Sequence, residues 1–470
     1  MTAGNRRKED KSEAQTGEPR RNLVPLPNGA MADKAERETS FLPGVHNIFI
    51  ATIERVVGEC NMKEAIAAVI SNKGAPGIDG ITTEEIKEVM RKQWPLIKQD
   101  ILDGKYCPSP VRRVEIPKPD GGVRQLGIPT VMDRIIQQAL HQELVPIFDP
   151  TFSPYSYGFR PNRSAQQAVL QTQAYIQEGC NWVVDIDLEK FFDKVNHDML
   201  MARVARRVKD KKILLLIRRF LQAGVMENGL VKPTEEGTPQ GGPLSPLLSN
   251  VMLDDFDREL EKRGLRFARY ADDCNIYVKS EKAGRRVMDA AVRYLTKKLK
   301  LKVNQQKSAV DNSWNRKFLG FTFTTGKEPN RIAVHESRVK RFKDKIKGIT
   351  KKMRGSKLTE SIRKQLMPVT RGWANYFGIA EERGIFEGLD GWIRRRIRDI
   401  LWRQWKRPRT RRKRLITLGL KEHTAAKTAY GSKGPWRMAR TPGMHKALSN
   451  GVIEAMGYIS MMSIVQARSQ

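Results

Sequence analysis

Two adjacent aspartates between strand-like segments restrict the possible fold of this chain more than any other feature. Asp272 and Asp273 separate the runs 265–270 and 275–278, which predicts two strands joined by a tight turn. Neighbouring carboxylates repel one another unless cations neutralise them, and magnesium is a hard ion that prefers oxygen ligands. The pattern therefore predicts a hairpin that presents carboxylates to divalent metal ions.

A second apolar run also ends in an aspartate. Residues 182–187 predict a short buried strand, with Asp185 and Asp187 on the same strand face. Beside the hairpin, such a carboxylate would help to hold two ions that activate a 3′-hydroxyl and stabilise leaving pyrophosphate. An aspartate at a turn is more often structural, so this interpretation depends on further motifs.

The rest of residues 46–329 mixes helices and strands, which predicts an α+β fold. The predicted elements are two helices within 48–90 flanking a loop at 72–80, strands 111–117 and 123–128 around a turn at 118–122, and a helix over 132–148. Apolar residues recur at helical spacing after residue 328, so we expect a helical domain over 330–400 and a basic domain over 401–470. Residues 1–45 are polar and aperiodic, which predicts a disordered leader.

The charge is unevenly distributed along the chain. Residues 1–330 carry 52 basic and 42 acidic side chains, whereas residues 331–470 carry 34 and 10, within a total net charge of +34. This imbalance predicts a polyanionic partner, with nucleic acid as the first candidate. The four cysteines are widely spaced and no apolar run is long enough to span a membrane, so we expect a cytoplasmic protein without zinc ribbon, disulfides or secretion signal.

Ordered motifs over residues 60–465 resemble the group II intron-encoded reverse transcriptase/maturase family. The resemblance implies a right-hand polymerase with fingers and palm, a helical thumb and a small basic C-terminal domain. It also implies an RNA-directed DNA polymerase that assists intron splicing and copies the intron by target-primed reverse transcription. The matching blocks are 72–80, 117–140, 156–161, 187–197, 238–246, 270–273 and 318–321.

The resemblance assigns the catalytic carboxylates. Asp187, Asp272 and Asp273 are the implied catalytic residues, and Asp187, Asp272 and the Leu188 backbone carbonyl are the implied ligands of two magnesium ions. Asp185 is the rival to Asp187, which is preferred because the family pattern begins five residues before its aromatic, Phe192.

Binding of dNTPs is implied for residues in three separate blocks. Phe192 would lie under the incoming sugar and exclude a 2′-hydroxyl, and a core phenylalanine is the alternative. Lys118 and Arg124 would contact the triphosphate, with a solvated surface hairpin as the alternative. Gln240 and Gly241 would contact the nucleotide where glycine allows close backbone approach.

Further residues have weaker assignments. Lys307 is a candidate near the pyrophosphate or a solvated lysine, and Arg160 is a template or nucleotide contact or a structural ion pair. The implied primer grip is Phe318, Leu319 and Gly320, whose aromatics core packing explains equally well. We treat all six histidines as structural.

The basic C-terminal third predicts contact with structured RNA, because tryptophans are interleaved with arginines. Residues 371–377 resemble the maturase-specific thumb segment and 434–439 resemble a DNA-binding tail. The predicted RNA-binding residues are Arg394, Arg395, Arg396, Arg398, Lys406, Arg407, Arg411 and Arg412.

The implied partners are group II intron RNA, target or primer DNA, and dNTPs, in a bacterial cytoplasm at the nucleoid. The sequence lacks the paired cysteines and H-N-H pattern of an endonuclease domain, so we expect the primer to come from an existing nick or replication fork. Two alternatives stay open: a domesticated reverse transcriptase of DNA repair or phage defence, and an RNA-binding splicing factor without polymerase activity. Oligomeric state stays undetermined.

Overall fold

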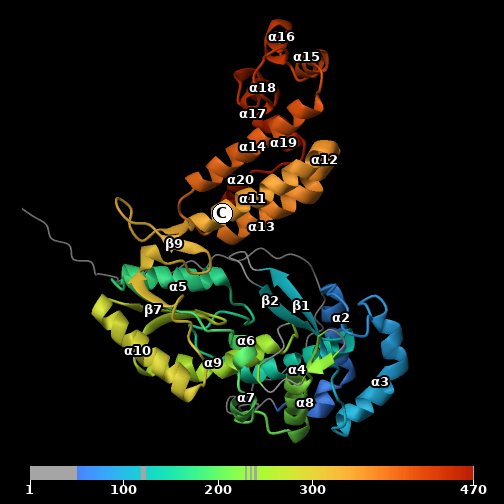
Figure 1. Ribbon diagram of the computed structural model, residues 1–470, viewed down its shortest axis with the longest axis vertical. Helices are drawn as coiled ribbons and strands as arrows, with labels where there is room; N and C mark the ends of the chain where they lie inside the picture. The colour runs from blue at the N-terminus through green and yellow to red at the C-terminus, as the bar shows by residue number, and fades with distance from the viewer. Residues whose placement is uncertain (1–49, 118–122, 228–229, 233–235, 238–240, 469–470) are drawn as a thin grey trace, which may run out of the picture. The chain divides into compact units, whose positions relative to one another are not determined.

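The computed structural model describes residues 50–117, 123–227, 230–232, 236–237 and 241–468. Residues 49–470 form one compact unit, in which helices and strands are mixed (Figure 1). The α+β prediction is therefore confirmed. The predicted leader at 1–45 lies outside the described residues.

The N-terminal part of this unit combines helices with a small sheet. The predicted strands 111–117 and 123–128 pair antiparallel, from Arg112 with Ile128 to Pro117 with Val123. The sheet order is β2-β1-β4-β5, with β1 and β4 parallel. Its elements are α1 (Ile53–Val56), α2 (Glu59–Ser71), α3 (Ile86–Leu102), β1 (Val111–Pro117), β2 (Val123–Ile128), α4 (Val131–Phe148), α8 (Lys211–Gln222), β4 (Val225–Glu227) and β5 (Leu230–Lys232).

A four-stranded antiparallel sheet in the order β6-β7-β3-β8 forms the palm. Alternate side chains leave the sheet on opposite faces, so Val184 and Ile276 join one core with α9 and α10, while Val183 and Tyr277 join another with α5. The elements are η1 (Asp149–Thr151), α5 (Ala165–Gln177), β3 (Trp182–Ile186), α6 (Phe191–Lys194), α7 (His197–Val204), α9 (Ser245–Lys262), β6 (Arg266–Tyr270), β7 (Asp273–Val278), α10 (Glu281–Lys298) and β8 (Ala309–Asn312).

A short strand precedes the helices of the thumb. We expected helix from about residue 330, but Ile332–Val334 forms β10, which pairs with β9 (Phe321–Phe323). Three apolar residues are too few to reveal a strand period in the sequence. The elements around and after them are η2 (Ser313–Asn315), α11 (Glu336–Lys352), η3 (Met353–Gly355), α12 (Leu358–Ser361), the π-helical turn η4 (Ile362–Leu366), α13 (Met367–Phe377) and α14 (Gly384–Gln404).

The C-terminal helices share one hydrophobic core with the thumb. Trp402, Leu415 and Tyr458 are buried in the same cluster as Phe386 of α14, and α14 itself runs past residue 400. Asp390 of α14 accepts a hydrogen bond from the Tyr458 hydroxyl at 2.6 Å, which attaches the C-terminal segment to this helix. The elements are α15 (Pro408–Thr417), α16 (Glu422–Ala429), α17 (Pro435–Met438), α18 (Pro442–Ala447), α19 (Asn450–Ala455) and α20 (Met461–Gln466).

None of the described helices is both long enough and apolar enough to cross a bilayer.

Candidate active site

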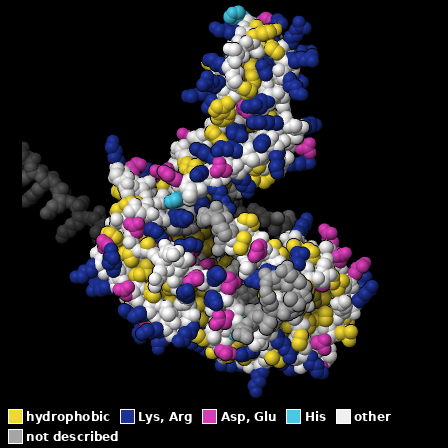
Figure 2. Space-filling view, viewed as in Figure 1, with side chains coloured by type: hydrophobic (Ala, Val, Ile, Leu, Met, Phe, Trp, Pro, Cys, Tyr) yellow, Lys and Arg dark blue, Asp and Glu magenta, His cyan; other side chains and the backbone are white. Residues whose placement is uncertain are grey.

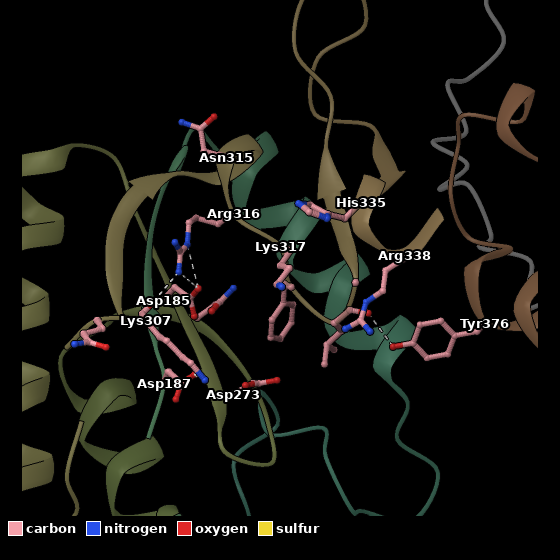
Figure 3. Close-up of a pocket in the computed structure, with 15 residues that line it drawn as sticks. Asp185, Asp187, Asp273, Lys307, Asn315, Arg316, Lys317, His335, Arg338 and Tyr376 are labelled. Atoms are coloured by element: carbon pink, nitrogen blue, oxygen red, sulfur yellow. Dashed lines mark hydrogen bonds and ion pairs between the residues drawn. The ribbon is translucent and has the colours of Figure 1, made fainter. Parts of the chain in front are cut away.

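The register of the palm sheet brings the aspartates to one edge. Asp185 pairs with Asn275 and Ile186 with Cys274, so the next pair in this register is Asp187 and Asp273. The Ser308 hydroxyl accepts from the Asp187 backbone amide at 3.0 Å, which fixes the end of the strand. Figure 3 shows Asp185, Asp187 and Asp273 along one wall of a pocket.

The turn that contains Asp272 is tight, and a buried arginine side chain stabilises it through a hydrogen bond. Tyr270 pairs with Asp273, which leaves Ala271 and Asp272 as the turn residues, and Ala271 has a left-handed φ of 60°. Arg269 donates from Nη1 to the Ala271 carbonyl at 2.8 Å. Its guanidinium is buried, although sequence analysis gave it no role; a charged residue inside an apolar strand was the available signal.

The carboxylates at this edge raise one another's proton affinity. Desolvation raises the pKa of Asp273 to about 7, and the neighbouring charges of Asp272, Asp185 and Asp187 add to the rise. Asp273 is exposed toward the pocket. The desolvation therefore comes from the protein atoms on the other side of its carboxylate. A bound cation would offset the repulsion between these carboxylates.

The donor set fits magnesium. Within the described residues, no three His, Cys, Asp or Glu side chains are close enough to enclose a metal ion by themselves. Magnesium is commonly held by one or two carboxylates while substrate phosphates and water supply the remaining oxygens. An open group of oxygen donors beside a solvent-accessible pocket meets that requirement.

Asp185 and Asp187 differ in their partners. Arg316 donates to Asp185 Oδ2 from Nη2 at 2.5 Å and from Nε at 3.1 Å. In the described residues, Asp187 forms one ion pair, in which Lys307 Nζ lies 3.9 Å from its Oδ2. A carboxylate already bound by a guanidinium is the poorer metal ligand, which supports the preference for Asp187.

The Leu188 carbonyl is also compatible with its predicted role. Leu188 bridges to Val303, and the two backbone hydrogen bonds beside this bridge use the Asp187 carbonyl and the Glu189 amide. Neither bond uses the Leu188 carbonyl.

The predicted primer grip lies in the wall of the same pocket, which has a volume of about 650 Å³. Leu319 and Gly320 have φ values of 54° and 89°, as in the tightest hairpin turns, and the Tyr376 hydroxyl donates to the Leu319 carbonyl at 3.0 Å. Phe318 is buried, so core packing accounts for its ring.

Three basic residues to which sequence analysis assigned no substrate role line this pocket near the predicted primer grip (Figure 3). They are Lys317, Arg338 and His335. Desolvation lowers the pKa of His335, and the positive charges of Lys317 and Arg338 lower it further. His335 also caps α11, with its Nδ1 accepting from the Ser337 amide at 3.2 Å.

A second pocket, of about 550 Å³, brings together two of the predicted nucleotide contacts, Phe192 and Gly241. They come from segments almost fifty residues apart in the chain. Lys118 and Gln240 lie outside the described residues, as does the side chain of Arg124.

The Arg160 side chain is buried and forms hydrogen bonds within the protein. Its side chain is 6% exposed and donates to Asp149 Oδ1 at 2.7 Å and to the Ser153 carbonyl at 2.7 Å. Of the two roles considered for Arg160, the structural ion pair is the one observed.

The predicted RNA-binding residues fall into two groups. Lys406, Arg407 and Arg412 are exposed. Figure 2 shows many Lys and Arg side chains on the C-terminal helices. Arg398 is 3% exposed and donates to the Leu448 carbonyl at 2.9 Å, so its guanidinium is not at the protein surface in this structure. Buried arginines of a basic helix cannot be told from exposed ones by composition.

The remaining predicted RNA contacts are partly buried and make intramolecular contacts. Arg395 stacks on the Trp436 ring at 3.9 Å, and Arg396 donates to Thr350 Oγ1 at 2.7 Å. Arg411 stacks on the Trp402 ring at 4.3 Å, and Arg394 lies 3.8 Å from Glu454.

A palm sheet with aspartates at one edge, followed by a helical thumb, defines a template-directed nucleic-acid polymerase. Residues 116–323 match the family model described as reverse transcriptase (RNA-dependent DNA polymerase). Residues 339–418 match the model described as group II intron, maturase-specific domain.

Parts of the chain are also similar to individual proteins and to a solved structure. Protein YkfC of Escherichia coli (strain K12) is 34% identical over 290 residues, which cover 53% of this chain and 76% of YkfC. The group II intron-encoded protein LtrA of Lactococcus lactis subsp. cremoris is 40% identical over 207 residues, which cover 42% of this chain and 33% of LtrA. Among solved structures, a partial Cas6-RT-Cas1–Cas2 complex matches 52% of this chain and 42% of its own at 25% identity, with a TM-score of 0.35.

The chain belongs to the group II intron-encoded reverse transcriptase/maturase family. It is by class an RNA-directed DNA polymerase with a maturase domain, as the motifs predicted. Reverse transcriptases use divalent metal ions, and the maturase domain implies binding of intron RNA.

Proposed function

We propose that this chain binds its parent group II intron RNA, assists its splicing, and copies it into DNA from a 3′-hydroxyl supplied by target DNA. The observation that carries the polymerase step is the convergence of Asp187, Asp272 and Asp273 at the edge of the palm sheet, beside a pocket of about 650 Å³. Lys317 and Arg338 in the same pocket add positive charge that suits a nucleic-acid backbone.

The proposed metal ligands are Asp187, Asp272 and the Leu188 carbonyl, and the proposed ions are two magnesium ions. When bound, such a pair supplies Lewis-acid stabilisation of the attacking and leaving oxygens in nucleotidyl transfer. Asp273 is the proposed third catalytic carboxylate, and Arg316 makes Asp185 less available as a metal ligand by binding its carboxylate.

The pocket of about 550 Å³ is the proposed seat of the incoming dNTP. Phe192 and Gly241 both line it. The Phe192 ring under the sugar would collide with a 2′-hydroxyl, and the Gly241 backbone would contact the nucleotide. Lys118 and Arg124 on the β1–β2 hairpin would contact the triphosphate, and Gln240 would contact the nucleotide itself.

Primer extension on an RNA template with dNTPs and magnesium tests the polymerase step. The full chain should extend a DNA primer, and the double variant Asp272→Asn/Asp273→Asn should not. Asp289→Asn, an exposed aspartate on α10, is the matched control and should retain activity. Absence of extension by the folded wild-type protein would refute the proposal.

Sugar selection gives a second readout at the same site. Phe192→Val should raise incorporation of ribonucleotides relative to deoxynucleotides, because the smaller side chain leaves space for the 2′-hydroxyl. The ratio of kcat/KM for an rNTP and the matching dNTP measures this within one protein preparation. An unchanged ratio would remove Phe192 from the sugar site.

The maturase role predicts separable activities. The aspartate double variant should still promote splicing of its own intron RNA, because the exposed cations Lys406, Arg407 and Arg412 are left intact. We place the protein in the bacterial cytoplasm at the nucleoid, where nascent intron RNA and target DNA are both present. Loss of splicing with the double variant would argue against separate RNA-binding and polymerase functions.

A further inference from the structure

The loop Gly158-Phe159-Arg160 lies directly behind the turn that carries Asp272. Gly158 packs so closely on this turn that a Cβ there would collide with the Ala271 backbone nitrogen. Asn250, fully buried, donates from Nδ2 to the Gly158 carbonyl at 2.8 Å. The first residue of the loop is therefore fixed to the catalytic turn.

The third residue of the loop is fixed to the protein interior. Arg160 donates from Nη1 to the carbonyls of Ser153 at 2.7 Å and Ser156 at 3.0 Å, and from Nη2 to the carbonyl of Asp149 at 2.8 Å. A side chain with this many partners leaves the loop little freedom. The residue between Gly158 and Arg160 is thus held in one position from both sides.

That middle residue, Phe159, has an unfavourable backbone conformation and an exposed ring. Its φ is 59°, a left-handed value that is a genuine outlier for a bulky side chain. Its side chain is 46% exposed, so burial offsets little of this strain. Asparagine or glycine would fit the backbone better, which indicates that the ring itself is needed.

The ring borders the pocket of about 550 Å³ that also contains Phe192 and Gly241. It lies 6.4 Å, centroid to centroid, from the ring of Tyr270, the first residue of the catalytic turn. Phe159 therefore connects the pocket proposed for the dNTP with the turn that carries the carboxylates.

We infer that Phe159 is a nucleobase contact that helps to position the base pair formed by the template and the incoming dNTP. An aromatic face binds every base by stacking and sequence-independent packing, which suits a site that must accept all four pairs. Pro243 adds apolar surface to the same pocket. The inference rests on the proposed function of this pocket.

Single-nucleotide extension with Phe159→Asn tests this inference. The variant should raise the KM for the dNTP by about ten-fold, within the range for loss of one base–aromatic contact. Because asparagine tolerates the left-handed backbone, the melting temperature should stay equal or rise. Phe159→Tyr should keep a KM near that of the wild type, and Leu170→Ala, at an equally exposed apolar residue of α5, should leave the KM unchanged.

The outcomes separate this inference from the proposed function. Wild-type extension with an unchanged KM in Phe159→Asn would overturn the base contact while the polymerase proposal stands. A fall in melting temperature with Phe159→Asn would show that the ring serves folding, and would also overturn it. Absence of extension by the wild-type protein would instead remove the proposed function on which the inference rests.

Discussion

Arg269 and Asp257 form a buried ion pair beside the turn that contains Asp272, with 2.6 Å between Nη2 and Oδ2 and 2.7 Å between Nε and Oδ1. The same guanidinium donates to the carbonyl of Ala271 and to Asn250 and Ser156. All five of its N–H groups therefore donate hydrogen bonds: three to side chains of α9, one to the turn at Ala271 and one to Ser156 in the loop before α5. The pair links the position of Asp272 to the packing of the palm.

Removal of this arginine should be costly. Arg269→Met would leave Asp257 as an unpaired buried charge, and breaking such a pair costs about 3–5 kcal/mol of unfolding free energy. Chemical denaturation measures the loss. Arg266→Met on the same strand is the matched control, because its ion pair with Glu178 is about half exposed on both sides and such pairs contribute about 0–1 kcal/mol. Equal losses in the two variants would contradict the prediction.

Asp254 should make stability depend on pH. Desolvation raises its pKa from 3.8 to about 6, and the charge of Asp257 adds to the rise. Between about pH 4 and pH 6 the folded state then binds more protons than the unfolded state, so the unfolding free energy falls as the pH rises through this window. The loss is at most about 3 kcal/mol.

The isosteric variant Asp254→Asn removes this dependence. Relative to the wild type, it should gain stability as the pH rises from about 4 to about 6 and keep that gain at higher pH. Melting temperatures of both proteins across the window measure the difference. A difference that stays constant with pH would show that Asp254 titrates normally.

Magnesium should stabilise the folded protein through Asp187 and not through Asp185. A ligand that binds only the folded state raises the melting temperature, and the rise grows with the logarithm of the ligand concentration above its Kd. Asp187→Asn should lose most of this shift. Asp185→Asn should keep it, although its basal stability should fall because Arg316 loses its carboxylate partner. The opposite result would make Asp185 the metal ligand.

The convergence of aspartates at one edge of the palm sheet could be predicted because its sequence signals are local. Asp187 and Asp273 each adjoin an apolar strand, and the register follows from the alternation of those strands. The sequence left Arg160 open between a substrate contact and a structural ion pair and gave Phe159 no role, since a loop motif does not reveal which side chain turns inward. The strand Ile332–Val334 was likewise too short to show a period.

The same limit applies to the basic C-terminal region, and it leads to a prediction about RNA affinity. Arg398 and Arg407 are indistinguishable by charge, yet Arg398 is buried against Leu448 while Arg407 is exposed. Arg407→Gln should weaken binding of the intron RNA and lower the slope of log affinity against log salt concentration by about 1, as expected for one lost phosphate contact. Its melting temperature should not change.

Arg398→Gln should instead reduce the unfolding free energy by about 1–3 kcal/mol, because the Leu448 carbonyl loses its donor. It should leave the salt slope intact as long as the protein stays folded. Filter binding across a salt series, with thermal unfolding of both variants, measures the two effects. A reduced salt slope in Arg398→Gln at full folding would mean that this helix rearranges to present its buried arginine to RNA.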